Sequence, residues 1–234
     1  MLSGSFRPLF AASVALGAFL HLSPAHAVPM LSLNATGAGS PVIVVDDGAN
    51  DDPGTVFIPG IVSYTGSVGV FDINTTTGVT KPLIGSATSP IHDLNSINVN
   101  GAGPGTITLM FTETDYFTAG GVLDFSFGLG GVAADTIQFQ AFASDANTAF
   151  GLDTLIVDSG VLSGSGSGTF FGSALLSGTY SLTTVVTITH SGIGQNTSFG
   201  ATLTTIPAPG FGPVILAGLV AMGASRLRRR RLDA

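Results

Sequence analysis

Apolar and polar residues alternate along much of the chain between residues 28 and 205. This alternation is typical of β-strands with one buried face, because successive side chains of a strand point to opposite sides. In residues 106–112, Ile107, Leu109 and Phe111 share one face and the threonines lie mainly on the other. The same period recurs in residues 123–127, 137–142 and 182–189, whereas a convincing helical period is missing from this region.

Glycine, asparagine and aspartate separate the predicted strands. Residues 119–121 lie between a strand that ends near Phe117 and one that starts at Val122, and residues 128–131 separate the latter from Thr136. Short glycine-rich segments favour hairpin turns, so these three strands are predicted to form a meander. Further short strands are predicted at residues 42–45, 56–64, 68–73, 97–99, 155–157, 168–171 and 199–203.

A β-chain of this length does not usually remain one open sheet, because about ten short strands usually pack as two sheets. The sequence therefore predicts an all-β fold, an antiparallel two-sheet sandwich of the jelly-roll type, as a single domain over residues 28–205. Two stretches are predicted to be irregular. Residues 79–90 contain two prolines, and residues 163–168 are a Gly-Ser run of the kind found in flexible linkers.

Residues 1–27 have the composition of a secretory signal peptide. Arg7 supplies the positive charge, residues 9–20 form the apolar core, and Ala25 and Ala27 are the small residues of the cleavage site. We predict an N-terminal signal helix that is removed after export, so that the mature chain starts at Val28. The alternative is a retained membrane helix, for which the apolar core is short.

The C-terminal segment, residues 206–234, has three parts in a fixed order. Its first part is a stiff spacer, because each proline fixes its own φ and disfavours a helical residue before it; the spacer is Ile206, Pro207, Ala208 and Pro209. Residues 211–225 are all apolar or small, and five arginines follow: Arg226, Arg228, Arg229, Arg230 and Arg231. The apolar run predicts a transmembrane helix near the lower limit of about 17 to 25 residues, with the arginines on the cytoplasmic side.

This order of proline motif, short apolar helix and basic tail resembles the PEP-CTERM sorting signal of Gram-negative bacteria. The family's usual motif is Val-Pro-Glu-Pro, and Ala208 stands at the position of its glutamate. The resemblance implies that an exosortase, which is a membrane enzyme, processes the tail, and that the inner membrane holds the chain only transiently. An ordinary short tail anchor is the alternative.

The charge of the central region differs from that of the whole chain, whose net charge is −7. Only Lys81 of the seven basic residues lies between residues 28 and 205, against 13 of the 14 acidic residues, so one positive and thirteen negative charges give −12. A surface of this sign repels phosphate backbones, which argues against a nucleic-acid partner. Cysteine is absent, so an exported domain of this size must rely on its hydrophobic core.

Few residues of the central region offer catalytic chemistry. His92 and His190 are its histidines, but the chain has no nucleophile elbow in a strand-turn-helix context. Glu113 and Asp115 have the same parity on one strand, as two glycosidase carboxylates facing a sugar would need. Their position near the end of that strand favours a solvated strand end. The sequence therefore predicts a protein that is not an enzyme.

One acidic cluster stands out from the rest of the sequence. Four carboxylates and a carboxamide lie within seven residues: Asp46, Asp47, Asn50, Asp51 and Asp52. Calcium accepts six to eight oxygen ligands, so this cluster is a candidate calcium site. The spacing is not that of an EF-hand loop, and a solvated acidic loop is the alternative.

Taken together, these features predict an exported structural or adhesive protein of the cell envelope or extracellular matrix. Its expected location is the cell surface or the matrix, after a transient single-pass membrane anchor. The expected partners are an exosortase-type sorting enzyme, the inner membrane and, as a candidate, extracellular polysaccharide. The second hypothesis is a calcium-dependent carbohydrate-binding module, which exposed tyrosines clustered beside the acidic loop would favour.

Overall fold

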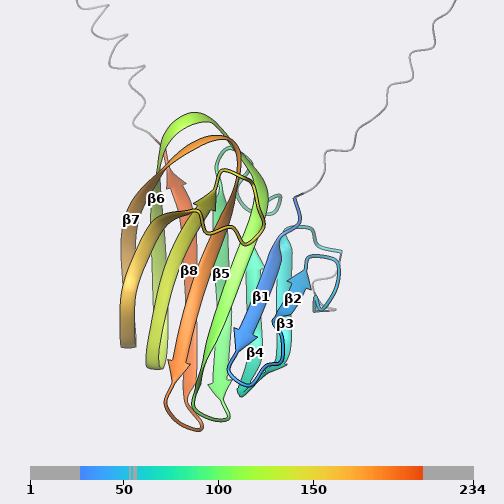
Figure 1. The fold of residues 1–234 in the computed structure, drawn as a ribbon, viewed down its shortest axis with the longest axis vertical. Coiled ribbons are helices and arrows are strands. Elements are labelled where there is room, and N and C mark those ends of the chain that lie inside the picture. Colours follow the sequence, from blue (N-terminus) through green and yellow to red (C-terminus); the bar gives the residue numbers. More distant parts are fainter. Residues whose placement is uncertain (1–26, 53, 55–56, 208–234) are drawn as a thin grey trace, which may run out of the picture.

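The computed structural model describes residues 27–52, 54 and 57–207. These residues form an all-β, antiparallel structure and contain no helix, as the alternating pattern predicts (Figure 1). The strands are β1 (Met30–Ala35), β2 (Val42–Val45), β3 (Ile61–Val68), β4 (Phe71–Val79), β5 (Ile91–Gly101), β6 (Gly105–Ser144), β7 (Thr154–His190) and β8 (Asn196–Ile206).

Strands β6 and β7 form one long antiparallel ribbon that folds back on itself twice. Three stretches of β6 pair with three stretches of β7: residues 105–118 with 178–190, 121–133 with 164–176, and 136–143 with 154–163. The register is irregular at the junctions between these stretches. At each junction the ribbon passes from one layer of the fold to the other.

The remaining pairings complete two layers, which are visible in Figure 1. One layer contains, in hydrogen-bonded order, residues 154–163, 136–144, 178–190 and 105–118, then β1 and β2. The other contains residues 164–176 and 121–133, then β8, β5, β4 and β3. A hairpin rolled between two antiparallel sheets is the arrangement of a jelly roll, so the predicted sandwich is confirmed.

The hydrophobic core lies between the inward faces of the two layers. The ring of Phe139 in the first layer contacts the rings of Phe127 and Phe199 in the second, with centroid distances of 6.2 and 4.8 Å. The residues that the alternation assigns to the inner face are buried, among them Ile107, Leu109, Phe111, Phe125, Leu182, Val186 and Ile188. Burying each such side chain stabilises the fold by about 1.5–3 kcal/mol, so the parity of each strand fixes its register.

Gly120 and Gly121 lie at a bend within the ribbon, whereas residues 128–131 pair without interruption with β7 and β8, so the predicted meander is wrong. Gly120 and Gly121 have φ values of 106° and 122°, which residues with a side chain rarely adopt. They let the ribbon turn from one layer to the other without ending its pairing. The stretches of β6 consequently pair with β7 and β8 instead of with one another.

The Gly-Ser run at residues 163–168 belongs to strand β7, so its interpretation as a linker is also wrong. Ser165 pairs with Val132, and Gly166 pairs with Gly131. Ladder hydrogen bonds involve only the backbone, so a run with few side chains can still be part of a sheet. The prediction for residues 79–90 is confirmed, because no named strand lies between the end of β4 and the start of β5.

The predicted signal helix and transmembrane helix lie outside the described residues, which include only the last residue of the signal peptide and the first two residues of the sorting tail. Of the predicted signal cleavage site and the proline motif, the structure describes Ala27, Ile206 and Pro207, and Ile206 ends β8. The other predicted residues lie outside it: Ala25, Ala208, Pro209, Arg226, Arg228, Arg229, Arg230 and Arg231. Among the residues that are described, no helix is long and apolar enough to cross a membrane.

Two phenylalanines on neighbouring strands test the assignment of inner and outer faces. Phe125 is fully buried, whereas Phe171, whose backbone pairs with Ser126, is 70% exposed. In a fragment of residues 27–207, we expect Phe125→Ala to lower the free energy of unfolding by about 3–5 kcal/mol and Phe171→Ala by less than about 0.5 kcal/mol. Urea denaturation followed by circular dichroism measures both values, and equal losses would contradict the assignment.

Candidate functional sites

The acidic residues after β2 form the first candidate site. Asp46 and Asp47 directly follow the strand, and the loop leads through Asp51 to β3. Carboxylate oxygens of these three residues lie within 4.8 Å of one another. The structure thus brings together three of the five residues predicted to bind calcium.

Hydrogen bonds from the backbone hold these three carboxylates in place. The N–H of Gly60 donates to Asp46 Oδ2 at 2.7 Å, and the N–H of Ser63 donates to Asp51 Oδ1 at 2.8 Å. The N–H of Asp47 donates to Asp51 Oδ2 at 3.2 Å, and Asp47 Oδ1 accepts a hydrogen bond from the N–H of residue 57. The acidic side chains therefore organise the loop that connects β2 to β3.

The charge of Asp46 is poorly compensated. Burial raises its pKa to about 6, and the negative charges of Asp47 and Asp51 add to the effect, although the N–H of Gly60 opposes it. Its Oδ1 atom is buried and has no hydrogen-bond partner within the described part of the chain. A proton or a cation bound there would relieve this energetic cost.

Asn50 and Asp52, the other two predicted calcium ligands, form hydrogen bonds to nearby backbone groups. The Nδ2 atom of Asn50 donates to the carbonyl of Ile43 at 2.8 Å, and Asp52 Oδ1 accepts a hydrogen bond from the N–H of Gly54 at 2.9 Å. These short-range contacts are typical of polar residues in turns. The candidate calcium site is consequently smaller than the sequence predicts.

Glu113 lies in the core, so its interpretation as part of a solvated strand end is wrong. Its side chain is fully buried, and its Oε1 atom is 2.7 Å from the Nζ atom of Lys81. A bulge between Glu113 and Tyr116 separates Glu113 from Asp115, which has a φ of 60°. Asp115 instead accepts a hydrogen bond from Asn147 Nδ2 at 2.6 Å, so the two carboxylates do not form a pair.

Tyr116 and Thr80 extend this buried polar cluster. The Tyr116 hydroxyl donates to Glu113 Oε2 at 3.1 Å and shares a hydrogen bond with Thr80 Oγ1. Burial raises the pKa of Glu113, and the hydrogen bonds from Lys81, Thr80 and Tyr116 offset part of this change. Burial and the neighbouring Glu113 charge raise the pKa of Tyr116, so its hydroxyl stays protonated.

Both histidines of the central region are buried. The ring of His92 packs against the rings of Phe111 and Tyr116, with centroid distances of 4.7 and 5.6 Å. Burial, together with the charge of Lys81, lowers the pKa of His92 to about 3. His190 Nε2 lies 2.9 Å from Thr197 Oγ1, and burial lowers its pKa as well. Both imidazoles are therefore neutral at physiological pH and shielded from solvent.

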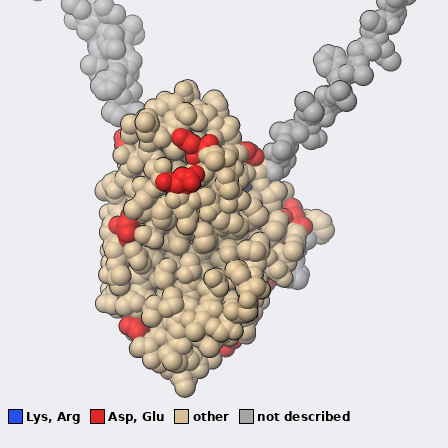
Figure 2. All heavy atoms as spheres, in the orientation of Figure 1, with Lys and Arg blue, Asp and Glu red and all other residues tan. Residues whose placement is uncertain are grey.

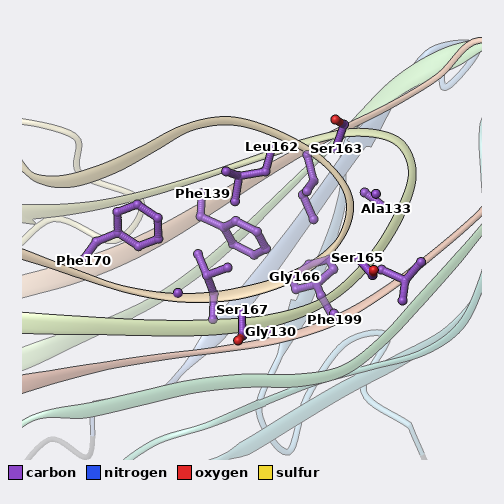
Figure 3. A pocket seen from close by; sticks show the side chains of 16 residues that line it. Gly130, Ala133, Phe139, Leu162, Ser163, Ser165, Gly166, Ser167, Phe170 and Phe199 are labelled. Atoms are coloured by element: carbon purple, nitrogen blue, oxygen red, sulfur yellow. The ribbon is translucent and has the colours of Figure 1, made fainter.

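An apolar cavity of about 240 Å³ lies where the β6–β7 ribbon makes its second bend (Figure 3). Phe139, Phe170, Phe199 and Leu162 line it, together with the Gly-Ser run at residues 163–168. Several of the lining residues are glycines, which bring no side chains to this space. Sequence reasoning missed it, because the bend itself was not predicted.

The visible acidic groups are scattered over the surface. In the face shown in Figure 2, the carboxylates form separate small patches on an otherwise uncharged surface, and no basic side chain is visible. Within the described part of the chain, Lys81 is the single lysine or arginine, and only 12% of its side chain is exposed. The exposed charge of the domain is therefore almost entirely negative.

Comparisons with known proteins do not assign the chain to a family. No family model matches the sequence, and no curated protein matches it. Two solved structures show distant similarity. The isomalto-dextranase of Arthrobacter globiformis T6 complexed with panose has 12% identity and a TM-score of 0.25, and the match covers 62% of this chain and 23% of that one.

The second structure is that of infectious bursal disease virus, Gx strain, with 11% identity and a TM-score of 0.33. The match covers 89% of this chain and 55% of the viral one. The chain therefore spans about a quarter and about half of the lengths of these two proteins.

The buried His92 makes the stability of the fold sensitive to acid. Its pKa is about 3 in the folded protein and close to 6.5 when unfolded, so below pH 6.5 the unfolded state gains a proton that the folded state does not. Between pH 6.5 and pH 4.5, we expect His92 to lower the free energy of unfolding by about 2–3 kcal/mol.

His92→Leu removes this contribution and provides the control. The raised pKa values of Asp46 and Glu113 act in the opposite direction, but they are common to both proteins and cancel in the difference. Urea denaturation at the two pH values should therefore show that the free energy of unfolding falls less between pH 6.5 and pH 4.5 for His92→Leu than for the wild type. Equal losses would mean that His92 is already protonated in the fold or accessible to water.

Proposed function

We propose that this protein is an exported structural or adhesive component of the cell envelope or extracellular matrix and carries out no catalysis. The observation that carries this proposal is the location of the acid-base groups. Glu113, His92 and His190 lie in the core, where a substrate in solution cannot reach them, and only 12% of the Lys81 side chain is exposed. The exposed ionisable groups of the described residues are mainly aspartates.

The outer faces of the sandwich support a role in surface contacts. Hydroxyl groups pair across neighbouring strands, as in Thr106 with Thr189 at 3.1 Å and Ser126 with Thr204 at 3.1 Å. These faces offer hydrogen bonds but little positive charge, so an uncharged polysaccharide is a suitable partner and an anionic polymer is not. Extracellular polysaccharide is therefore the partner that we propose for them.

The position of the two ends of the β-domain supports an attachment at one end of the sandwich. β8 ends at Ile206, the first residue of the proline motif, and the start of β1 lies at the same end of the fold (Figure 1). A sorting enzyme at the membrane would thus meet the proline motif without opening the β-domain. We propose that an exosortase-type enzyme processes the tail there and so transfers the domain to the cell surface.

Processing of the tail can be tested in the natural host. We expect mass spectrometry of the mature surface fraction to find peptides of the β-domain and none that cover residues 216–234. Replacing Pro207 and Pro209 with alanine should trap the precursor in the membrane, because the backbone before the apolar helix would lose its extended form. Neutral replacements of the five arginines should instead release unprocessed protein, because the charges that prevent translocation are lost.

Intact tail peptides in the surface fraction of the wild type would contradict processing. They would leave the ordinary tail anchor as the explanation of this segment.

The three clustered carboxylates favour a second candidate function, a calcium-dependent carbohydrate-binding module. The buried, unpartnered Oδ1 atom of Asp46 supports the calcium part, since a cation would compensate it. The carbohydrate part has less support. Tyr116 and Tyr180 are buried, so these rings cannot stack on a sugar, and Tyr64, which follows Ser63 in β3, is half-buried.

Calcium should raise the melting temperature of the protein once its concentration exceeds the dissociation constant. We expect Asp46→Asn to abolish this response. Without calcium, the same substitution should stabilise the fold at pH 7.5, because the folded state holds the carboxyl pKa near 6 and so disfavours its charged form. Asp124→Asn, on the outer face of β6, serves as the control and should keep the calcium response. An unchanged melting temperature up to millimolar calcium would contradict the calcium site.

A further inference from the structure

The contact between Lys81 and Glu113 joins two distant segments of the chain inside the sandwich. Lys81 lies just after β4, and Glu113 lies in β6. The Nζ atom of Lys81 donates to Glu113 Oε1 at 2.7 Å and to the carbonyl of Thr114 at 2.7 Å, and it lies 4.6 Å from the centre of the Tyr116 ring. The Thr114 carbonyl and the Tyr116 ring thus help to hold the amine against the carboxyl group.

The other carboxylate oxygen of Glu113 has its own partner. Oε2 accepts a hydrogen bond from the Tyr116 hydroxyl at 3.1 Å, and that hydroxyl in turn contacts Thr80 Oγ1. Glu113, Tyr116 and Thr80 are all fully buried. The two oxygens of the carboxyl group are therefore distinguished, because one faces an amine and the other faces a neutral hydroxyl donor in a site that excludes bulk water.

Holding a full charge pair in such a site is energetically costly. Removing an ammonium and a carboxylate from water carries a large desolvation penalty, and their mutual attraction offsets only part of it. A neutral product that kept the same hydrogen bonds would avoid this penalty.

We propose that Lys81 and Glu113 form an intramolecular amide cross-link between Nζ and Cδ, with release of one water molecule. The proposal does not depend on the sorting tail or on calcium.

Atoms and charges balance without any co-reactant. Within the 2.7 Å contact, one proton passes from the Lys81 ammonium to Glu113 Oε1, which leaves a neutral amine and a neutral carboxylic acid. The nitrogen lone pair then attacks Cδ, and the Tyr116 hydroxyl stabilises the negative charge that develops on Oε2. A second proton passes from Nζ to Oε1, the Cδ–Oε1 bond breaks, and Oε1 leaves as water.

The surroundings favour each of these steps. Burial raises the pKa of Glu113, which favours the neutral acid, and the raised pKa of Tyr116 keeps its hydroxyl a donor. Oriented groups at contact distance also remove most of the entropic cost of joining them. The Lys81 side chain reaches solvent with 12% of its surface, which provides a path for the released water.

The product fits the same site. The amide oxygen is the former Oε2 and continues to accept the hydrogen bond from Tyr116. The remaining N–H of Lys81 continues to donate to the Thr114 carbonyl. No charge is then left in the interior at this point, and a chain without cysteine gains a covalent link between the segment after β4 and strand β6.

Peptide mass spectrometry of the full-length protein tests the cross-link. The protein is purified from the membrane fraction of an expression host, its folded state is checked by circular dichroism, and it is then digested under denaturing conditions with a protease that cuts at aromatic residues. We expect the peptide with Lys81 and the peptide with Glu113 to appear joined, at their summed mass less one water. Recovery of the two peptides separately and at full mass from the folded protein would overturn the proposal and leave an ion pair.

Two variants separate chemistry from folding. Lys81→Arg keeps a positive charge and N–H donors at the carboxylate but has no nucleophilic amine, so it should yield only separate peptides. Tyr116→Phe keeps the ring and removes the donor to Oε2, so the joined fraction should fall. A joined species that persists in Lys81→Arg would show that these two residues are not the ones linked.

Discussion

A single long ribbon, β6 with β7, must bury one face along its whole length, and the rest of the structure depends on this requirement. A straight ribbon of these lengths would expose most of its apolar face. Bending at residues 118–121 and 133–136 places its three stretches in two facing layers, so that the inward residues of all three meet in one core. β8 then pairs with the middle stretch, and β1 pairs with the first, which gives each layer its remaining strands.

The sequence predicts the local structure well, because every second residue of a half-buried β-strand is apolar and points into the core. The inward parity of Ile107, Leu109 and Phe111 and the bounds of β2 follow directly from this period. Short β1 was missed, although Leu31 and Leu33 alternate with polar residues, because it borders the predicted signal peptide. Strand partners were also mispredicted, since glycines permit a hairpin turn and a bend between layers equally well, and tertiary packing decides between them.

In the candidate sites, too, contacts between residues close in sequence were predictable and contacts between distant residues were not. The clustering of Asp46, Asp47 and Asp51 was predictable, because these residues are close in sequence and share one loop. The burial of Glu113 was not, because it depends on Lys81, 32 residues away, and on a bulge that turns Asp115 aside. The sequence nevertheless held a signal: one lysine and one glutamate stand alone in a region that otherwise relies on aspartate for its charge.

The placement of charge links this fold to its proposed role. A surface that carries aspartates and hydroxyl groups repels other anionic chains and resists precipitation, which suits a protein outside the cell. Lys81 carries the one positive side-chain charge of the described lysines and arginines. Its side chain is mostly buried against Glu113, so it does little to weaken this repulsion. A domain without disulfides must then obtain its stability from the interior alone. In this fold that interior combines a phenylalanine-rich core with one polar cluster, in which Lys81 and Glu113 connect the segment after β4 to β6, one of the two strands of the ribbon.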